Sequence, residues 1–444
     1  MSPINNKIFI LFTLAGFVYS QSIMNSYGMG IPGLYRDVAS SGLSSTGLVP
    51  GYGKNLSLMN PSTWPSSKFV LFSSTFKGAT RLFNQENIEN QYSNIDWLIF
   101  IVPIKQKYAF GIGMFPYADQ NIQFNREDLI YPDNEEFVSY SGGLTSFRLA
   151  FGFPLDDFGS GGWGFDLLFG STRVHKFTDI NEEIYIHDQR KMFNGVISQL
   201  YFTSNPFFIQ SKEMIFYLNL GFTLRDFSAE VQSYQPFIDR NHNGIHDVSY
   251  YESIPSNNDF PGAENSPDPF LTQFQGFYNP IELNLGVNVK YSSDISLVCE
   301  GGLWNNDSNI SDRLFEFSDG LNSKLFFSQA LIKYAKVFPQ NIFDRFHWRI
   351  GYNISQLKFD NNLNQIDKYD LSVGFGLPFG KFGSQIDFSF QFSDLYDDLK
   401  TCRQRSVEPL VCVNNGGYLI NESVQTIKIG LTIGDIWFVK RRNR

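Results

Sequence analysis

The most regular feature of the chain is an alternation of apolar and polar positions in runs of about ten residues. In 216–224 every second side chain is Phe or Leu, and in 281–289 every second side chain is Ile, Leu or Val. The same alternation returns in 369–377, 386–392 and 427–433. Successive side chains of a strand point to opposite faces of the sheet. Each run therefore predicts a strand with one apolar face and one wetter face.

The length of these runs favours a membrane barrel over a soluble sandwich. Strands of soluble proteins usually have about five or six residues, whereas a tilted membrane strand needs about nine to eleven. The whole chain yields fourteen candidate strands, an even number, as is typical of bacterial barrels. They are 67–76, 95–103, 107–117, 145–154, 162–170, 193–203, 213–224, 281–291, 295–303, 324–334, 345–354, 368–377, 384–392 and 424–434.

The segments between these strands alternate in length. Seven long polar segments are expected at 77–94, 118–144, 171–192, 225–280, 304–323, 355–367 and 393–423, and shorter ones lie between them. In outer-membrane barrels long loops face the outside and short turns face the periplasm. A closed barrel also pairs every strand edge, which lipid requires. We therefore expect an all-β, antiparallel transmembrane barrel over 67–439, with 225–280 as its longest loop and 440–444 as a basic periplasmic tail.

Composition excludes other classes. The chain has 444 residues, 42% of them hydrophobic, and a formal net charge of −9. Disordered chains have few hydrophobic residues and high net charge, so this class is excluded. No run approaches the 18 to 20 apolar residues of a spanning helix, which excludes a helical membrane protein. The acidic balance argues against a nucleic-acid partner.

The first 20 residues predict export. Lys7 precedes the apolar run 8–17, and the compact Val18 and Ser20 stand just before Gln21, as in a secretory signal peptide. In the oxidising compartment that this implies, Cys402 and Cys412 are interpreted as a loop disulfide, the alternative being two unpaired thiols.

The segment 21–66 is not strand-periodic. It is dense in Gly and Ser, and it ends on Leu56-Ser57-Leu58-Met59 followed by Asn60-Pro61-Ser62. Its Leu, Met and Tyr content indicates that it packs somewhere, and the interior of the barrel is the nearest apolar shelter.

The signal peptide, the Gly-rich segment closing on Asn60-Pro61 and the fourteen strands together resemble the FadL-type outer-membrane proteins. This family includes long-chain fatty-acid transporters and the PorV-like barrels of type IX secretion. Its pattern of glycines followed by Asn-Pro-Ala maps onto Gly42, Gly47, Asn60 and Pro61, with Ser62 in place of alanine. The resemblance implies that residues 21–66 plug the lumen.

The resemblance also implies a function, for which two hypotheses remain. The first is transport of a hydrophobic small molecule across the outer membrane through the plugged barrel. The second is a PorV-like scaffold that binds a secreted or outer-membrane partner protein without transport. Pro116 either ends the third strand at Phe115 or kinks it and opens a lateral path to lipid, since proline cannot donate a ladder hydrogen bond.

The inward face is expected to be mixed. Alternation points Glu282, Lys290, Asp370, Asp387 and Gln391 inward, together with an apolar patch. The patch is formed by Leu98, Phe100 and Val102, with Trp97, Ile99 and Ile101 on the outer face. An open porin would be polar throughout, so a plugged barrel is favoured.

Residues 239–247 resemble a calcium loop. Asp239, Asn241, Asn243 and Asp247 stand at positions one, three, five and nine around Gly244, and the Ile245 carbonyl would be a further ligand. Position twelve is Tyr250 and not the usual Glu, so a metal-free turn rich in Asn and Asp is the alternative. No serine or carboxylate stands at a catalytic spacing from any of the five histidines, so we expect no enzyme.

Overall fold

The structure is a computed structural model of the whole chain. It describes residues 28–33, 37–83, 88–105, 107–127, 135–180, 183–209, 212–239, 268–306, 314, 321–336, 338–359, 365–380, 382–397 and 421–436. The signal peptide 1–20, the tail 440–444 and residues 240–267 of the loop 225–280 therefore lie outside the described residues.

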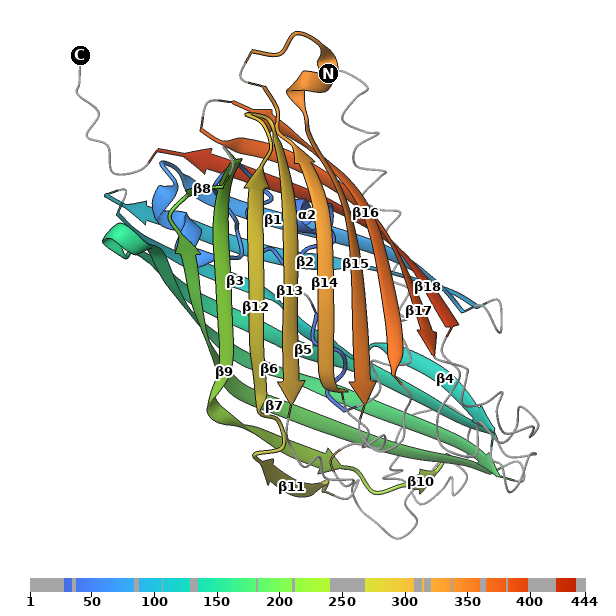
Figure 1. Cartoon of the computed structure of the whole chain (residues 1–444). Coiled ribbons are helices and arrows are strands. Elements are labelled where there is room, and N and C mark those ends of the chain that lie inside the picture. Colours follow the sequence, from blue (N-terminus) through green and yellow to red (C-terminus); the bar gives the residue numbers. More distant parts are fainter. Residues whose placement is uncertain are drawn as a thin grey trace, which may run out of the picture.

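A closed, antiparallel barrel of fourteen strands forms the described fold, as the sequence predicts (Figure 1). Each barrel strand pairs with its neighbour along the chain, and the last strand pairs with the first from Val70↔Asp435 to Phe83↔Glu422. The barrel strands are β1 (Val70–Phe83), β2 (Ile88–Ile104), β3 (Tyr108–Asp119), β5 (Glu135–Pro154), β6 (Gly159–Ile180), β7 (Glu183–Ser204), β9 (Lys212–Ser233), β12 (Pro280–Lys290), β13 (Ile295–Asn306), β14 (Leu321–Lys333), β15 (His347–Phe359), β16 (Ile366–Phe379), β17 (Ser384–Asp397) and β18 (Asn421–Asp435).

Four short strands extend this sheet without belonging to the ring. β4 (Ile122–Glu127) pairs with β5, β8 (Phe207–Ile209) and β11 (Phe270–Gln275) pair with β9, and β10 (Phe237–Ile238) pairs with β7. The helical elements are one or two turns long: α2 (Val38–Ser41), η2 (Pro61–Ser66), η3 (Asp156–Phe158) and η5 (Ile342–Arg345). Within the described residues no helix has the length and apolarity needed to cross a membrane.

The two ends of the barrel differ. One end carries the short connections 105–107, 155–158, 205–211, 291–294, 334–346 and 380–383, and we call it the turn end. The other end carries the remaining connections, among them 234–279 between β9 and β12, and we call it the loop end. Figure 1 shows the turn end at the top and β10 and β11 near the loop end.

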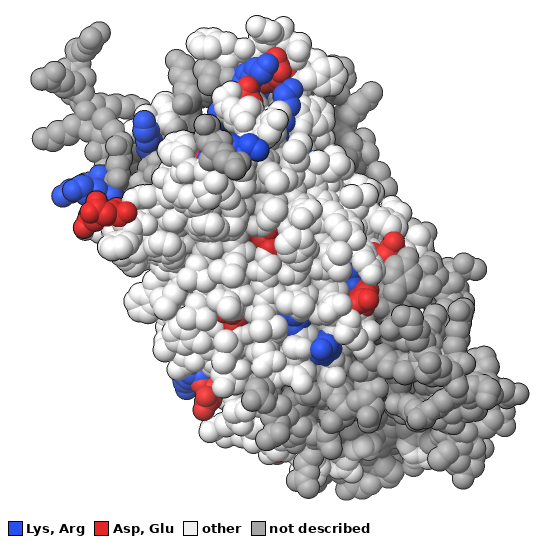
Figure 2. Space-filling model, in the orientation of Figure 1, with Lys and Arg blue, Asp and Glu red and all other residues white. Residues whose placement is uncertain are grey.

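The outer face is apolar across the middle of the barrel. Leu285, Leu325, Ile350 and Leu371 are each about half exposed on neighbouring strands, and they point away from the lumen. Figure 2 shows only scattered charged side chains across the middle of this face and a denser group near the turn end. Such a belt is the surface that hydrocarbon requires, and it follows directly from the alternation in the sequence.

Several strands are longer than the sequence predicts. The expected loops 77–94 and 171–192 are largely strand, because β1 and β2 and then β6 and β7 continue as hairpins. β6, β7 and β9 have 22 residues each, or roughly 70 Å at about 3.3 Å per residue. The polar composition of these stretches reflects exposure to water beyond the membrane and not a lack of strand structure.

The inner and outer faces of β2 are the reverse of the prediction. Trp97, Ile99 and Ile101 are buried and point inward, whereas Leu98, Phe100 and Val102 are partly exposed on the outside. Both sets are apolar, so alternation could not decide between them. A bulge at Asp96, where the β1–β2 register shifts between Thr75 and Phe76, sets the inward face of the residues that follow.

Candidate functional site

The N-terminal segment 37–67 contacts the inner face of the barrel. Its two helical turns are capped by their own side chains: Ser40 N donates to Asp37 Oδ1 at 2.7 Å, and Ser62 N donates to Asn60 Oδ1 at 3.0 Å. Pro61 stands at the first position of η2, where its missing N–H costs nothing. The segment therefore has a defined local structure despite its Gly-rich sequence.

A buried carboxylate on β13 holds the middle of this segment. Glu300 accepts hydrogen bonds from Thr46 N and Thr46 Oγ1 and from Val49 N, each at 2.7 Å. Its side chain is 1% exposed. Hydrogen bonds to a charged acceptor stabilise by about 1.5–3 kcal/mol each, so Glu300 is the strongest single anchor of the segment that we identify.

A buried ion pair holds the next stretch. Arg349 on β15 lies 2.7 Å from Asp387 on β17 and donates from Nε to the carbonyl oxygen of Gly51 at 3.0 Å. Both side chains are buried. The Arg349 guanidinium therefore links β15 to β17 and also links the barrel wall to the N-terminal segment.

Glycines on the wall make room for the segment. A Cβ at Gly351 would lie 1.9 Å from the carbonyl oxygen of Leu43, and a Cβ at Gly111 would lie 2.4 Å from the ring of Trp64. Contacts of less than 3.0 Å would arise in the same way at Gly152, Gly162, Gly286, Gly374 and Gly430. These seven positions lie on β3, β5, β6, β12, β15, β16 and β18, so half of the strands of the ring contribute to the seat of the segment.

The motif residues that the sequence singles out all lie at close contacts. Gly42 packs on Gly374, where a Cβ would be 2.9 Å from the Gly374 Cα. Gly47 has φ +87°, a conformation that favours glycine. Asn60 Nδ2 donates to Leu48 O at 2.9 Å. Ser62, which departs from the family's alanine, shares a hydrogen bond of 2.6 Å with Thr203 on β7.

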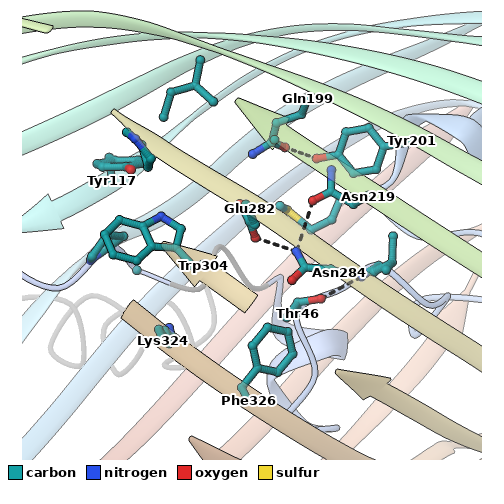
Figure 3. A pocket seen from close by; sticks show the side chains of 17 residues that line it. Thr46, Tyr117, Gln199, Tyr201, Asn219, Glu282, Asn284, Trp304, Lys324 and Phe326 are labelled. Atoms are coloured by element: carbon teal, nitrogen blue, oxygen red, sulfur yellow. Dashed lines mark hydrogen bonds between the residues drawn. The ribbon is translucent and has the colours of Figure 1, made fainter. Parts of the chain in front are cut away.

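A cavity of about 70 Å³ lies between the segment and the wall (Figure 3). Thr46, Leu48 and Met59 of the segment line it on one side, and Pro32 and Gly33 of the stretch 28–33 line it as well. The remaining lining comes from β3, β7, β9, β12, β13 and β14: Tyr117, Ile197, Gln199, Tyr201, Asn219, Gly221, Pro280, Glu282, Asn284, Trp304, Lys324 and Phe326. Sequence reasoning identified only Glu282 among these as an inward residue.

The cavity is closed toward the loop end by aromatic side chains. Tyr117 shares a hydroxyl hydrogen bond of 2.8 Å with Tyr278, whose ring packs edge-on against Phe227 at 4.8 Å. Burial raises the pKa of Tyr278 well above its ordinary value, so its hydroxyl stays protonated. This layer covers the cavity with rings whose polar atoms are already paired.

Beside the cavity the wall has an incomplete ladder. β2 and β3 pair from Ile104↔Tyr108 to Leu98↔Met114, but β2 runs back to Ile88 and β3 runs on to Asp119. We call this unpaired stretch the seam. Within the described residues, the β2 side of the seam pairs only with β1 and the β3 side only with β5.

Pro116 lies in the seam, and β3 continues through it, so the strand does not end at Phe115. Pro116 pairs with Thr145, and the register to β5 shifts between Pro116 and Ala118. Tyr117 is the extra residue of this bulge. Its carbonyl accepts a hydrogen bond of 2.8 Å from Gly33 N, and its ring reaches the cavity. Bulges re-aim side chains in this way.

Two stacked rings cover the seam from the lumen. Trp97 and Phe115 stand one rung beyond the last β2–β3 pair, with ring centroids 5.1 Å apart and nearly parallel planes. The guanidinium of Arg148 lies 5.0 Å from the Phe115 ring centroid. Arg148 is in turn bound bidentately by Asp166, with both N–O distances 2.7 Å. Asp166 thus holds the Arg148 guanidinium in place beside the Trp97–Phe115 stack.

Other predicted site residues are not brought together by the described structure. Asn241, Asn243, Ile245 and Asp247 of the calcium loop lie outside the described residues. Asp239 is buried and follows β10. Cys402 and Cys412 also lie outside them, while Cys299 is a half-buried free thiol on β13. Among the described residues no cluster of three or more His, Cys, Asp or Glu could hold a metal. The calcium site and the disulfide remain predictions.

Comparison with known proteins gives the family. The model of the BamG family matches residues 5–396. No curated protein matches the chain. The crystal structure of a Pseudomonas aeruginosa FadL homologue is similar with a TM-score of 0.50 and 12% identity, over 89% of this chain and 97% of that one.

A second solved structure shows the same fold. It is the deltaS2S3 mutant of TodX, a monoaromatic hydrocarbon channel, with a TM-score of 0.50 and 11% identity over 86% of this chain and 94% of that one. These likenesses show a FadL-like barrel, and the matching family model with this barrel places the protein in the bacterial outer membrane. The chain belongs to the BamG family.

Proposed function

We propose that this protein moves small hydrophobic molecules across the outer membrane, with residues 37–67 as the plug of the lumen and the seam as a lateral path to lipid. The observation that carries the proposal is the seam itself. The β2–β3 ladder stops at Leu98↔Met114, and the bulge that follows brings Tyr117 to the cavity. A molecule dissolved in lipid would thus meet the lumen through the wall.

The size of the cavity supports a plugged and not an open state. Pockets for drug-sized ligands usually measure about 300–1,000 Å³, whereas this cavity has about 70 Å³. Passage of anything larger than a few heavy atoms therefore requires the plug or the Trp97–Phe115 stack to move. The similar structures named above are a FadL homologue and a hydrocarbon channel, which favours transport over catalysis.

A reversible lock across the seam tests the proposal. Trp97→Cys with Phe115→Cys places two thiols on the first rung beyond the ladder, so oxidation should tie β2 to β3. Whole cells that express the protein should show saturable uptake of radiolabelled toluene. Oxidation of the double variant should abolish this uptake, and reduction should restore it.

The matched control uses a closed part of the wall. Gln329→Cys faces the native Cys299 across β13 and β14, so oxidation there adds a disulfide without touching the seam. Uptake should persist in this control. If the oxidised seam variant takes up toluene as fast as its reduced form, lateral passage through the seam is refuted.

One observation favours the alternative function, a scaffold for a secreted or outer-membrane partner protein. The connection 334–346 at the turn end exposes three apolar side chains, Phe338 at 86%, Ile342 at 64% and Phe343 at 62%. Exposed apolar clusters often mark protein contacts. Loss of a co-purifying partner from a Phe338→Ser/Ile342→Ser variant, with no saturable uptake by the parent protein, would favour the scaffold.

A further inference from the structure

The polar side of the cavity presents acceptors whose neighbouring donors are already used. Asn284 Nδ2 donates to Glu282 Oε1 at 2.6 Å and to Asn219 Oδ1 at 3.1 Å, so one amide group serves two acceptors (Figure 3). Asn284 Oδ1 is buried and has no hydrogen-bond partner among the described residues. A buried acceptor left unpaired costs about 1–3 kcal/mol, so a donor at this place would be stabilised.

The charges around the cavity disfavour a carboxylate ligand. Glu282 is an acid that lines the cavity on β12. The nearby Arg148 is neutralised by Asp166, and it also donates to Gln199 Oε1 at 2.8 Å. Lys324 lines the cavity on the same rung as Glu282, with Trp304 on the strand between them, and it is buried and already has an interaction partner. Both cations are therefore already engaged, and an anion would place a further negative charge beside Glu282.

Other side chains that line the cavity suit an apolar body. Trp304, Phe326 and Met59 line it, and the hydroxyl of Tyr117 is already paired with Tyr278. None of these groups offers a further strong hydrogen bond toward a ligand head. The cavity thus combines an acceptor-rich polar face with an apolar face.

We propose that the cavity selects small neutral alcohols, whose hydroxyl donates a hydrogen bond to Glu282, and rejects carboxylates. Glu282 is the residue that determines this specificity, and the unpaired Asn284 Oδ1 is a second acceptor beside it. The inference rests on the proposed function in that the cavity lies on the transport path. Within the class of hydrophobic molecules carried, it adds a preference for amphiphiles with a donor head.

Three probes with five heavy atoms each separate the head groups. Butan-1-ol and diethyl ether are isomers, and only the alcohol has a donor, while propionate carries a negative charge. Binding can be followed by the methyl resonance of Met59, which lines the cavity, in protein labelled with ¹³C-methyl methionine. The wild-type protein should bind butan-1-ol about tenfold or more tightly than diethyl ether. It should not bind propionate.

Substitution of the acid should remove the discrimination. In Glu282→Leu the ratio of the two affinities should fall to about one, and in Glu282→Gln propionate should begin to bind. Asp367→Asn, on β16 and outside the cavity lining, removes the same charge and should change nothing. An equal affinity for alcohol and ether in the wild type, or an unchanged ratio in Glu282→Leu, would overturn the inference.

The two proposals fail separately. Binding at Met59 is measured without transport. If the protein prefers butan-1-ol but takes up toluene equally fast with the seam locked, the lateral path is refuted and the specificity of the cavity stands. A protein that needs the seam for uptake but shows no preference for the alcohol would refute the specificity and keep the path.

Discussion

At the scale of single residues, the lumen contains carboxylates with different roles. The Glu300 carboxylate accepts three hydrogen bonds from the N-terminal segment, whereas Glu282 lines a cavity. Sequence alternation predicted that acids point inward, as Asp370 and Asp387 do, both buried. It could not assign their roles, because the partners of Glu300 lie about 250 residues away in sequence.

Removal of the Glu300 anchor should loosen the segment without unfolding the barrel. Glu300→Ala leaves Thr46 N and Val49 N without their acceptor, and we expect a loss of roughly 3–5 kcal/mol in the local free energy of opening. Hydrogen exchange of residues 44–50 should accelerate accordingly, while β13 to β15 remain protected. In Glu300→Gln, which keeps one acceptor oxygen, the exchange rate of residues 44–50 should lie between those of the wild type and Glu300→Ala. Unchanged exchange in Glu300→Ala would contradict the role of this residue as an anchor.

A methyl group added at a wall glycine should displace the N-terminal segment, because it would clash with the backbone of that segment. Gly351→Ala would place a Cβ 1.9 Å from the Leu43 carbonyl oxygen, so the segment must shift. Gly78→Ala on β1 is the matched control, because no atom lies within 4 Å of its Cβ position. We expect limited proteolysis to cut 37–67 only in the first variant. Equal resistance of both variants would show that the seat tolerates a larger side chain.

The turn-end connection 334–346 should respond to acid. Desolvation raises the pKa of Asp344, but hydrogen bonds from Lys336 and Lys333 outweigh it, so the pKa lies below its ordinary value. A lowered carboxylate pKa stabilises the folded connection above the unfolded pKa of about 4, and this stabilisation is lost as the pH falls through the folded value. The ¹⁹F line of a fluorinated phenylalanine at position 338 should therefore narrow below about pH 4. Asp344→Asn should show the narrow line already at pH 7, and a line width independent of pH would refute the mechanism.

At the scale of elements, the alternating pattern predicted where strands lie better than where they end or which way they face. All fourteen predicted strands overlap a barrel strand. β6 and β7 run on to Ile180 and from Glu183, because polar residues on both faces still form a hairpin in water. On β2 both faces are apolar near the seam, and only the bulge at Asp96 decides that Trp97 turns inward.

The cavity could not be predicted at this scale either. Its lining is drawn from β3, β7, β9, β12, β13 and β14, and β3 reaches it through the bulge at Tyr117. Pro116 within a predicted strand was one visible signal, because it lies next to the bulge residue Tyr117. The small residues at inward positions, such as Gly286 and Gly374, were a second signal, because they alternate with lipid-facing residues and match a close contact.

At the scale of the whole molecule, the even strand number and the alternating loop lengths sufficed for the architecture. Closure leaves little freedom, since lipid forbids an open sheet edge in the wall. The contents of the lumen follow no such rule, and they depend on contacts between the N-terminal segment and strands up to 390 residues away.

Deletion of residues 37–67 behind an intact signal peptide should convert the barrel into an open pore. In planar bilayers we expect stepwise ion conductance from the deletion variant and none from the full chain, because Glu300, Arg349 and the wall glycines would face water. Saturable uptake of toluene should be lost at the same time. A silent deletion variant that still migrates as a heat-modifiable barrel would argue that other parts of the chain close the lumen.

The wall glycines also constrain the order of assembly. The N-terminal segment is synthesised before any barrel strand, yet its seat is shared by seven strands from β3 to β18. No partial barrel offers that seat, because Gly430 on the last strand receives Val38. The complete seat of the segment that is made first therefore exists only once the last strand has formed. Complete docking of the N-terminal segment therefore requires a closed ring, so a fully docked segment indicates a fully assembled barrel.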